Sequence, residues 1–188
     1  MKTLILNGSP RKNGDTAFLL SILKKHIDHE VIEISAYCDD ISPCVDCRAC
    51  QRKKGCVKND KMRLIYADDF DNIVIASPVY MSNLTPPLLG IASRLQAYYS
   101  AKRFLKDEFV IKEKKAALIL TGGGDWGPKV ALDSSRFIFK SLNAAGYEEH
   151  TALSLKTDNI PASEDGAAIS KGEEIAQYFN GRGQGYPI

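Results

Sequence analysis

The sequence predicts an α/β protein, a three-layer α/β/α sandwich around a five-stranded parallel sheet. Short apolar, β-prone runs alternate along the chain with stretches whose apolar residues have helical spacing, which is typical of right-handed βαβ units. The apolar runs are also continuous, as expected for parallel strands buried on both faces. At 188 residues the chain has the size of one compact domain, so we expect a single domain over residues 1–188.

The elements are expected in the order β-α-β-(Cys loop)-α-β-α-β-α-β-α. The predicted strands cover residues 2–6, 30–34, 72–76, 116–120 and 147–155. The predicted helices cover residues 16–27, 60–70, 87–105, 130–146 and 163–180. Asp15 or Thr16 suits the cap of the first helix, Ser163 and Glu164 suit the start of the last one, and Asn180 with Gly181 suits its end. The tail 181–188 has an irregular composition.

Composition excludes several classes of protein. Hydrophobic residues make up 44% and charged residues 26%, which is ordinary for a globular chain. The net charge of +2 is too small to indicate a nucleic-acid surface. The apolar runs are too short to span a bilayer, and no apolar leader follows Met1. We therefore expect a cytoplasmic protein that binds neither nucleic acid nor membrane.

The first loop, NGSPRKNGDT at residues 7–16, has the composition of an anion site. It follows a strand and opens a helix, where small residues such as Gly14 let main chain approach a ligand and helix N-H groups favour an anion. Ser9 and Thr16 add hydroxyl donors, and Arg11 adds a charge-assisted one. The loop matches neither the dinucleotide fingerprint nor the Walker pattern. It predicts either a phosphate site or a turn that carries no ligand.

Two further loops follow strands at the same edge of the predicted sheet. In SPVYMSNLTPP, Pro78 rigidifies the turn, and Tyr80 is either an aromatic wall of a crevice or a core aromatic. In TGGGDWG, three glycines let main chain pass close to a flat ligand, and Trp126 shields a pocket, joins a subunit contact or packs in the core. Three loops at the carboxyl ends of three strands predict one shared crevice.

A cysteine-rich loop at residues 38–60 contains the spacing Cys44-x2-Cys47-x2-Cys50-x5-Cys56. In a reducing cytosol such a cluster indicates metal binding or redox chemistry, and two-residue gaps let one loop wrap a [4Fe-4S] cluster. Zinc, a dithiol switch and a loop without a cluster remain alternatives. Cys38 lies outside the spacing and is expected to be a lone thiol. Four basic residues either offset the charge of a thiolate cluster or form a solvated surface: Arg48, Arg52, Lys53 and Lys54.

GSPR-x-N-G-x-T after the first strand and SPVY after the third make the chain resemble the flavodoxin-like, NADPH-dependent FMN reductases. The cysteine spacing resembles that of their iron-sulfur flavoprotein branch. The resemblance implies that FMN phosphate is held by Ser9, Arg11, Asn13, Asp15 and Thr16. It places the flavin beside Pro78, Val79, Tyr80, Asn83, Thr121, Gly122, Gly123 and Gly124, and a [4Fe-4S] cluster on Cys44, Cys47, Cys50 and Cys56. It assigns no catalytic acid or base.

The chain departs from the family pattern at two places. Relatives commonly carry Ser or Asn where this chain has Asp15, which favours a helix cap over a phosphate contact. Many relatives carry Lys and then Asp-Arg in the helix after SPVY, where this chain has Leu89 and then Ser93-Arg94. No role is therefore carried over from that acidic position.

The resemblance implies a flavin-dependent oxidoreductase that moves electrons between an iron-sulfur cluster or NAD(P)H and a small-molecule acceptor or a ferredoxin-like partner. One alternative is a cluster-free NAD(P)H-dependent FMN or quinone reductase. Another is a non-catalytic flavodoxin-like carrier, although ordinary flavodoxins tend to be acidic and this chain is slightly basic. The resemblance also implies a homodimer or homotetramer. The aromatic residues of the segment 85–105, Tyr98, Tyr99 and Phe104, either supply an interface or fill the core.

Overall fold

The described residues of the computed structural model, 1–107, 109 and 111–181, form a sheet of six strands. The strands are β1 Lys2–Asn7, β2 Glu30–Ser35, β3 Asn72–Pro78, β4 Lys114–Thr121, β5 Ala144–Ala145 and β6 Thr151–Ser154. The helices are α1 Asp15–His26, η1 Ala49–Gln51, α2 Met62–Tyr66, α3 Pro86–Ser93, α4 Gln96–Ser100, the π-helical turn η2 Ala101–Leu105, α5 Lys129–Ser141 and α6 Gly166–Phe179. Of the irregular tail, residues 182–188 lie outside the described residues.

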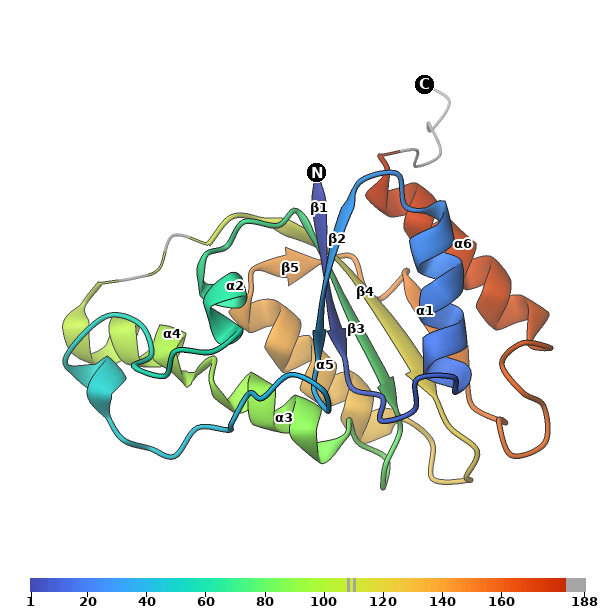
Figure 1. Ribbon diagram of the computed structural model, residues 1–188, viewed down its shortest axis with the longest axis horizontal. Helices are drawn as coiled ribbons and strands as arrows, with labels where there is room; N and C mark the ends of the chain where they lie inside the picture. The colour runs from blue at the N-terminus through green and yellow to red at the C-terminus, as the bar shows by residue number, and fades with distance from the viewer. Residues whose placement is uncertain (108, 110, 182–188) are drawn as a thin grey trace.

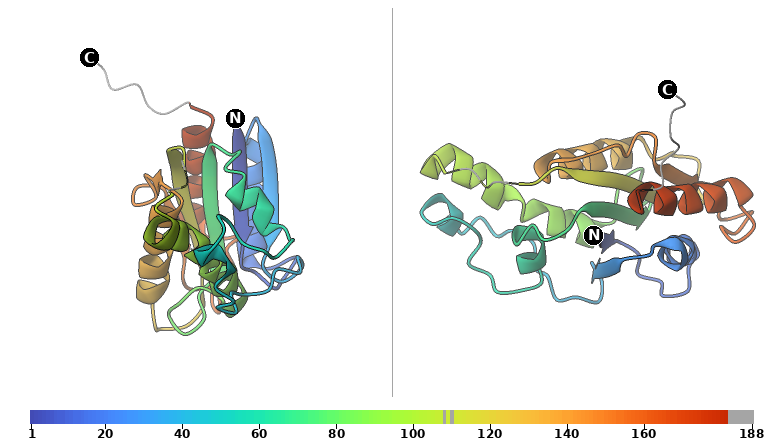
Figure 2. Two further views of the ribbon diagram at one scale, coloured as in Figure 1. Left: turned by 90° about the vertical axis from the view of Figure 1, so that its left-hand side faces the viewer. Right: turned by 90° about the horizontal axis from the view of Figure 1, so that it is seen from above.

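All strand pairs are parallel, and the strand order is β2-β1-β3-β4-β5, with β6 also pairing with β4. The order 2-1-3-4-5 is that of the flavodoxin-like sheets, in which the strand order reverses between β1 and β3. Helices cover both faces of the sheet, with α1 and α6 together on one of them (Figures 1 and 2). The predicted three-layer α/β/α sandwich is confirmed.

Two cores lie on opposite faces of the sheet because successive side chains of a strand point to opposite sides. In β1, Leu4 and Leu6 belong to one core and Ile5 to the other, and β3 and β4 repeat this alternation. The first core is completed by α2, α3 and α5, and the second by α1 and α6. Burial on both faces explains why the strand sequences are continuously apolar.

The longest predicted helix, residues 87–105, is broken into α3, α4 and η2. At the break, the N-H groups of Arg94 and Leu95 bond to carbonyls three residues back, those of Ile91 and Ala92, at 3.0 Å each. The guanidinium of Arg94 is held by a distant segment of the chain, so tertiary contacts decide where α3 ends. The helix predicted at 60–70 is also shorter in the structure, where α2 covers only Met62–Tyr66.

The predicted boundaries near residue 145 are wrong. The helix expected to reach residue 146 ends at Ser141, and Asn143 takes a positive φ of 52°. The strand expected at 147–155 is shorter, as β6, and the two-residue strand β5 lies within the range predicted as helix. The two strands pair with opposite ends of β4. Gly146, with a φ of 90°, lies between the two short strands and lets the chain turn there.

The predicted helix caps are only partly correct. Gly14 is the N-cap residue of α1, and Asp15 is its first helical residue, whose Oδ1 accepts a hydrogen bond from the N-H of Ala162 at 2.8 Å. In α6 the N-cap is Asp165, whose carboxylate accepts from the N-H of Ala168. The end of α6 is as predicted, with Asn180 at the C-cap.

No helix in the described part of the chain combines the length and apolar character needed to cross a membrane.

Replacing Phe179 by Ala should lower the free energy of unfolding by about 3–5 kcal/mol, because truncating a buried aromatic leaves a cavity. Phe179 of α6 is 0% exposed, whereas Phe137 of α5 is 67% exposed. Urea unfolding should show the loss in Phe179→Ala and a change within about 0.5 kcal/mol in Phe137→Ala. Equal losses in both variants would contradict this description of the core.

Candidate functional site

The loops that follow β1, β3 and β4 meet at the carboxyl edge of the sheet, at the lower edge of Figure 1. They enclose a cavity of about 180 Å³. Its lining consists of Ser9, Pro10, Arg11, Gly14, Asp15, Thr16, Pro78, Val79, Tyr80, Thr121, Gly122, Gly123, Thr157 and Asp158. The three loops singled out in the sequence therefore form one crevice, as expected for an open parallel sheet.

Ten of the thirteen residues predicted to bind FMN line this cavity, and three do not: Asn13, Asn83 and Gly124. Asn13 is exposed. The carboxamide oxygen of Asn83 accepts hydrogen bonds from the N-H of Leu84 at 2.8 Å and from Ser134 Oγ at 2.9 Å. Asn83 therefore braces the loop after β3 against α5.

The first loop is folded by its own polar side chains. Asn7 Oδ1 accepts a hydrogen bond from the N-H of Ser9 at 2.8 Å, and Ser9 Oγ accepts one from the N-H of Arg11 at 3.2 Å. Thr16 Oγ1 lies 2.7 Å from Thr121 Oγ1, which ties the start of α1 to the end of β4. The two hydroxyl-bearing loops are thus joined across the crevice.

Gly8 lets the first loop approach α3 closely. A Cβ atom at Gly8 would lie 2.8 Å from Leu88 Cδ2, 2.9 Å from Thr85 Oγ1 and 3.0 Å from Ser77 Oγ. All three neighbours are buried, and Thr85 Oγ1 also donates a hydrogen bond to the carbonyl of Gly8 at 2.8 Å. Because these groups have no room to move, only glycine fits this position.

The segment after β6 forms an outer wall of the cavity that sequence reasoning missed. The N-H of Thr157 donates to the carbonyl of Gly122 at 3.0 Å, and Asp15 holds the N-H of Ala162. The Asp158 carboxylate lies so close to Gly123 that a Cβ atom there would overlap Asp158 Oδ1. The strand-end rule points to Thr157 and Asp158 as well, when it is applied to the last predicted strand, which ends at residue 155.

Tyr80 and Trp126 are not core aromatics. Tyr80 is 42% exposed and lines the cavity, and its backbone exchanges two hydrogen bonds with Asn83. Trp126 is 83% exposed. The core-packing alternative is therefore wrong for both residues.

A second, smaller cavity of about 40 Å³ is lined by all four predicted cluster ligands, Cys44, Cys47, Cys50 and Cys56. It lies where the cysteine loop meets α4 and the break after α3, at the left of Figure 1. Arg94, Ala97 and Ser100 complete its inner wall, together with Gln96. Cys38 is exposed and lies outside this lining.

The four sulfur-bearing side chains share the cavity but do not converge on a point. Within residues 1–107, 109 and 111–181, no three His, Cys, Asp or Glu side chains are gathered closely enough to hold a metal ion. Two of the basic residues of the loop are paired with carboxylates, Arg48 with Asp46 at 3.4 Å and Lys54 with Asp107 at 2.8 Å.

Arg94 is the buried cation of this region. Its side chain is 1% exposed, and its Nη1 atom lies 2.7 Å from Asp60 Oδ2. Burial lowers the pKa of Arg94, but hydrogen bonding to Asp60 and the charge of Cys56 raise it more, so the pKa lies above its ordinary value. Burial and the nearby Cys56 also raise the pKa of Tyr66, whose hydroxyl donates to the carbonyl of Arg94 at 2.7 Å.

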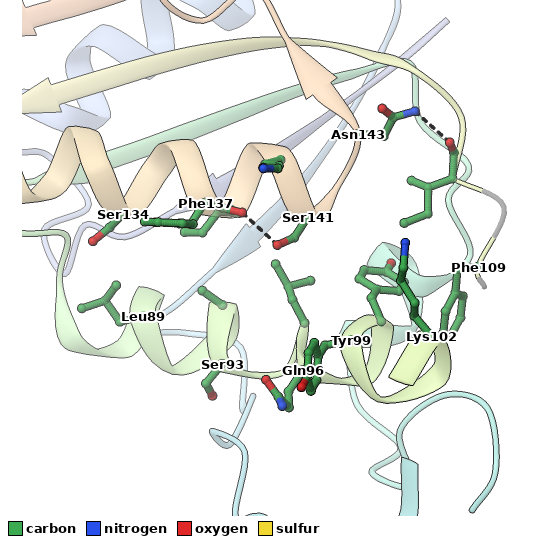
Figure 3. Close-up of a pocket in the computed structure, with 16 residues that line it drawn as sticks. Leu89, Ser93, Gln96, Tyr99, Lys102, Phe109, Ser134, Phe137, Ser141 and Asn143 are labelled. Atoms are coloured by element: carbon green, nitrogen blue, oxygen red, sulfur yellow. Dashed lines mark hydrogen bonds between the residues drawn. The ribbon is translucent and has the colours of Figure 1, made fainter. Parts of the chain in front are cut away.

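A broad groove of about 930 Å³ lies between α3 and α4 on one side and α5 on the other. Figure 3 shows Ser134, Phe137 and Ser141 of α5 across the groove from Leu89 and Tyr99. Its lining includes two exposed aromatic rings, those of Tyr99 and Phe137.

The profile of the NADPH-dependent FMN reductases matches residues 1–157. The chain belongs to this family. Membership places it among the flavin-dependent oxidoreductases, and the match includes the three loops of the crevice and the whole cysteine loop. The family resemblance read from GSPR-x-N-G-x-T and SPVY is confirmed.

Among curated relatives, this FMN reductase family member is similar to iron-sulfur flavoproteins. It is 26% identical over 160 residues to one from Methanocaldococcus jannaschii, covering 81% of this chain and 79% of that one. It is 31% identical over 105 residues to one from Archaeoglobus fulgidus, covering 52% of this chain. The match spans about half, 47%, of the Archaeoglobus relative's length.

Among solved structures, the family member resembles an FMN-dependent NADH-azoreductase from Bacillus anthracis in complex with FMN. The TM-score is 0.70 at 18% identity, and the alignment covers 96% of this chain and 100% of that one. At this identity the likeness shows the fold, which is flavodoxin-like.

Gly8→Ala should lower the free energy of unfolding by about 1–3 kcal/mol, because the added methyl overpacks a buried site. Gly124→Ala is the matched control, since a Cβ there has Trp126 Cδ1 as its nearest neighbour, at 3.9 Å. Chemical denaturation should leave this control within about 0.5 kcal/mol of the parent protein. A Gly8→Ala protein as stable as the control would mean that the first loop is not fixed against α3.

Proposed function

We propose that the protein is an FMN-dependent redox enzyme that transfers electrons between NAD(P)H or an iron-sulfur cluster and a small acceptor or redox partner. The observation that carries the proposal is the crevice at the carboxyl edge of β1, β3 and β4. It combines an anion-type loop at a helix start with a glycine loop at the end of β4. Membership in the FMN reductase family supports the same assignment.

The enclosed volume, about 180 Å³, is smaller than the roughly 300 Å³ expected for a whole cofactor pocket. We therefore assign the cavity to the phosphate and ribityl end of FMN. Ser9, Arg11 and Thr16 would hold the phosphate, because they offer hydroxyl and guanidinium donors beside the start of α1. Asp15, whose carboxylate already accepts from Ala162, would serve as a wall and not as a phosphate ligand.

Pro78, Val79 and Tyr80 on one side, with Gly122 and Gly123 on the other, would border the flavin ring. Their main chain supplies polar groups, and Tyr80 supplies an exposed aromatic ring. Bound FMN supplies hydride and electron transfer, for which the protein needs no acid or base of its own. Within this proposal the residues orient the cofactor and limit the access of water to it.

The cysteine cavity fits an iron-sulfur cluster by its donor set. Four cysteines on one loop line it, and soft thiolates are the ligands that such clusters require. The name of the curated relatives, iron-sulfur flavoprotein, supports an iron-sulfur cluster in this chain. The spacing of Cys44, Cys47, Cys50 and Cys56 favours the [4Fe-4S] type. Bound there, a cluster supplies one-electron transfer.

A second candidate function is a cluster-free NAD(P)H-dependent FMN or quinone reductase. It is favoured by the spread of the four cysteines, which do not gather into a metal site in the described part of the chain. The fold likeness to an FMN-dependent azoreductase is consistent with it. A non-catalytic flavodoxin-like carrier is the third candidate, and the slightly basic net charge of +2 weighs against it.

The cytoplasmic location, the ferredoxin-like partner and the homodimer or homotetramer stay predictions. The groove between α3, α4 and α5 is the surface that we assign to self-association. It carries the exposed rings of Tyr99 and Phe137, and it includes part of the predicted interface segment 85–105.

Arg11→Gln should weaken FMN binding roughly 10- to 100-fold, because a hydrogen bond to a charged group contributes about 1.5–3 kcal/mol. Riboflavin, which lacks the phosphate, should bind both proteins equally. Fluorescence titration of the flavin-free protein measures both affinities, with Lys25→Gln on exposed α1 as the control. A loss of riboflavin affinity equal to that of FMN would refute the phosphate assignment.

Protein purified without air should contain flavin, together with about four irons and a broad absorption shoulder if the cluster is [4Fe-4S]. Cys47→Ser should lose the iron and keep the flavin, whereas Cys38→Ser should keep both. Iron and flavin assays with absorption spectra measure this. Flavin without iron or zinc, together with rapid NADPH oxidation, would select the cluster-free reductase instead.

A further inference from the structure

The start of the cysteine loop is anchored on α3. The N-H of Cys44 donates to Ser93 Oγ at 2.9 Å. Gly90 lies one turn earlier on α3, and a Cβ there would be 3.5 Å from Pro43 Cβ, so Pro43 packs against a surface kept flat by glycine. The chain therefore enters the loop along a fixed path.

Arg94, the next residue along, holds both ends of the loop. Its Nη1 atom donates to the carbonyl of Ser42 at 2.9 Å and to Asp60 Oδ2 at 2.7 Å, and its Nη2 atom donates to Asp60 Oδ1 at 3.3 Å. Ser42 precedes the first of the four cysteines, and Asp60 follows the last. One guanidinium thus closes the loop that contains all four thiols.

Asp60 is itself fixed, because its Oδ1 atom accepts a hydrogen bond from the N-H of Met62 at the start of α2. Lys58 adds a second link across the loop, donating to Ser42 Oγ at 2.6 Å and to the Pro43 carbonyl at 2.9 Å. Lys58 is half-buried, whereas the Arg94 side chain is 1% exposed. The Arg94 link is therefore the one shielded from water.

One donor of Arg94 has no acceptor. Its Nε atom is buried and finds no hydrogen-bond partner in the described part of the chain. Arg94 also lines the cavity that all four cysteines line. A buried charged donor without an acceptor is unfavourable, so such a group commonly marks the place of a ligand.

We propose that Arg94 is a positioning residue for the cysteine loop, binding Ser42 and Asp60 at its two ends and donating its Nε hydrogen to a sulfur of the cluster held between them. This inference rests on the proposed iron-sulfur cluster. Lysine can replace the charge of Arg94 but not the Nε contact, because a single ammonium does not offer three fixed donor directions. The donated hydrogen bond raises the reduction potential of the cluster by stabilising its more negative form.

The test compares Arg94→Gln and Arg94→Lys with Arg103→Gln, which removes the same charge from exposed η2. Each protein is reconstituted without air with iron and sulfide, and iron, sulfide and FMN content are measured. We expect Arg94→Gln to retain less than half of the parent iron with unchanged FMN, and Arg103→Gln to match the parent. Arg94→Lys should retain iron but show a lower cluster potential in an anaerobic redox titration, which a purely structural role would not produce.

Trypsin cleavage of the metal-free protein tests the loop closure without the cluster, because Arg52, Lys53 and Lys54 are cleavage sites inside the loop. Arg94→Gln should speed cleavage there about tenfold, since proteolysis follows the population of the open loop. Arg103→Gln should not change the rate.

Parent-like iron content in Arg94→Gln, or a parent-like potential in Arg94→Lys, overturns the proposed role. Unchanged trypsin cleavage of Arg94→Gln overturns the loop closure. If the parent protein takes up no iron, the proposed cluster is refuted, and so is the contact between Arg94 Nε and the cluster. The trypsin cleavage rates then still test whether Arg94 closes the loop. Loss of FMN binding would show that Arg94→Gln does not fold. In that case the cluster potential of Arg94→Lys is the measurement that tests the proposal.

Discussion

The parallel pairing of β1, β3 and β4 is the constraint on which the rest of this protein depends. Parallel strands direct all their carboxyl ends to one edge of the sheet, and both faces of this sheet are buried by helices. Polar loops therefore have only the edges on which to gather. The hydroxyls of Thr16 and Thr121, distant in sequence, lie 2.7 Å apart because of this arrangement.

Helix α3 links the two cavities of the molecule. It begins after the cavity residues Pro78–Tyr80, and it ends at Arg94 in the wall of the cysteine cavity. The 8 residues of α3 extend over about 12 Å. Gly8 packs on the first half of α3 and Pro43 on its second half. One helix thus contacts both the first loop and the cysteine loop.

The ion pair of Arg94 and Asp60 has a role distinct from stability. Buried ion pairs often contribute little net free energy, because the cost of removing two charges from water offsets their attraction. Here the pair joins the segment before Cys44 to the segment after Cys56. Its effect is conformational, since it restricts a loop that has little regular structure of its own beyond η1.

The sequence by itself determined the sheet, its buried strands and the crevice, because continuous apolar runs and strand-end loops act locally and repeat along the chain. It did not determine the break at Arg94, the short strand β5 before Gly146, or the hydrogen bond that joins Asp15 to the segment after β6. Those features depend on partners far away in the chain, as when Asp60 and Ser42 bind Arg94 or Ala162 binds Asp15. Only folding brings such partners together, so only the tertiary structure decided them.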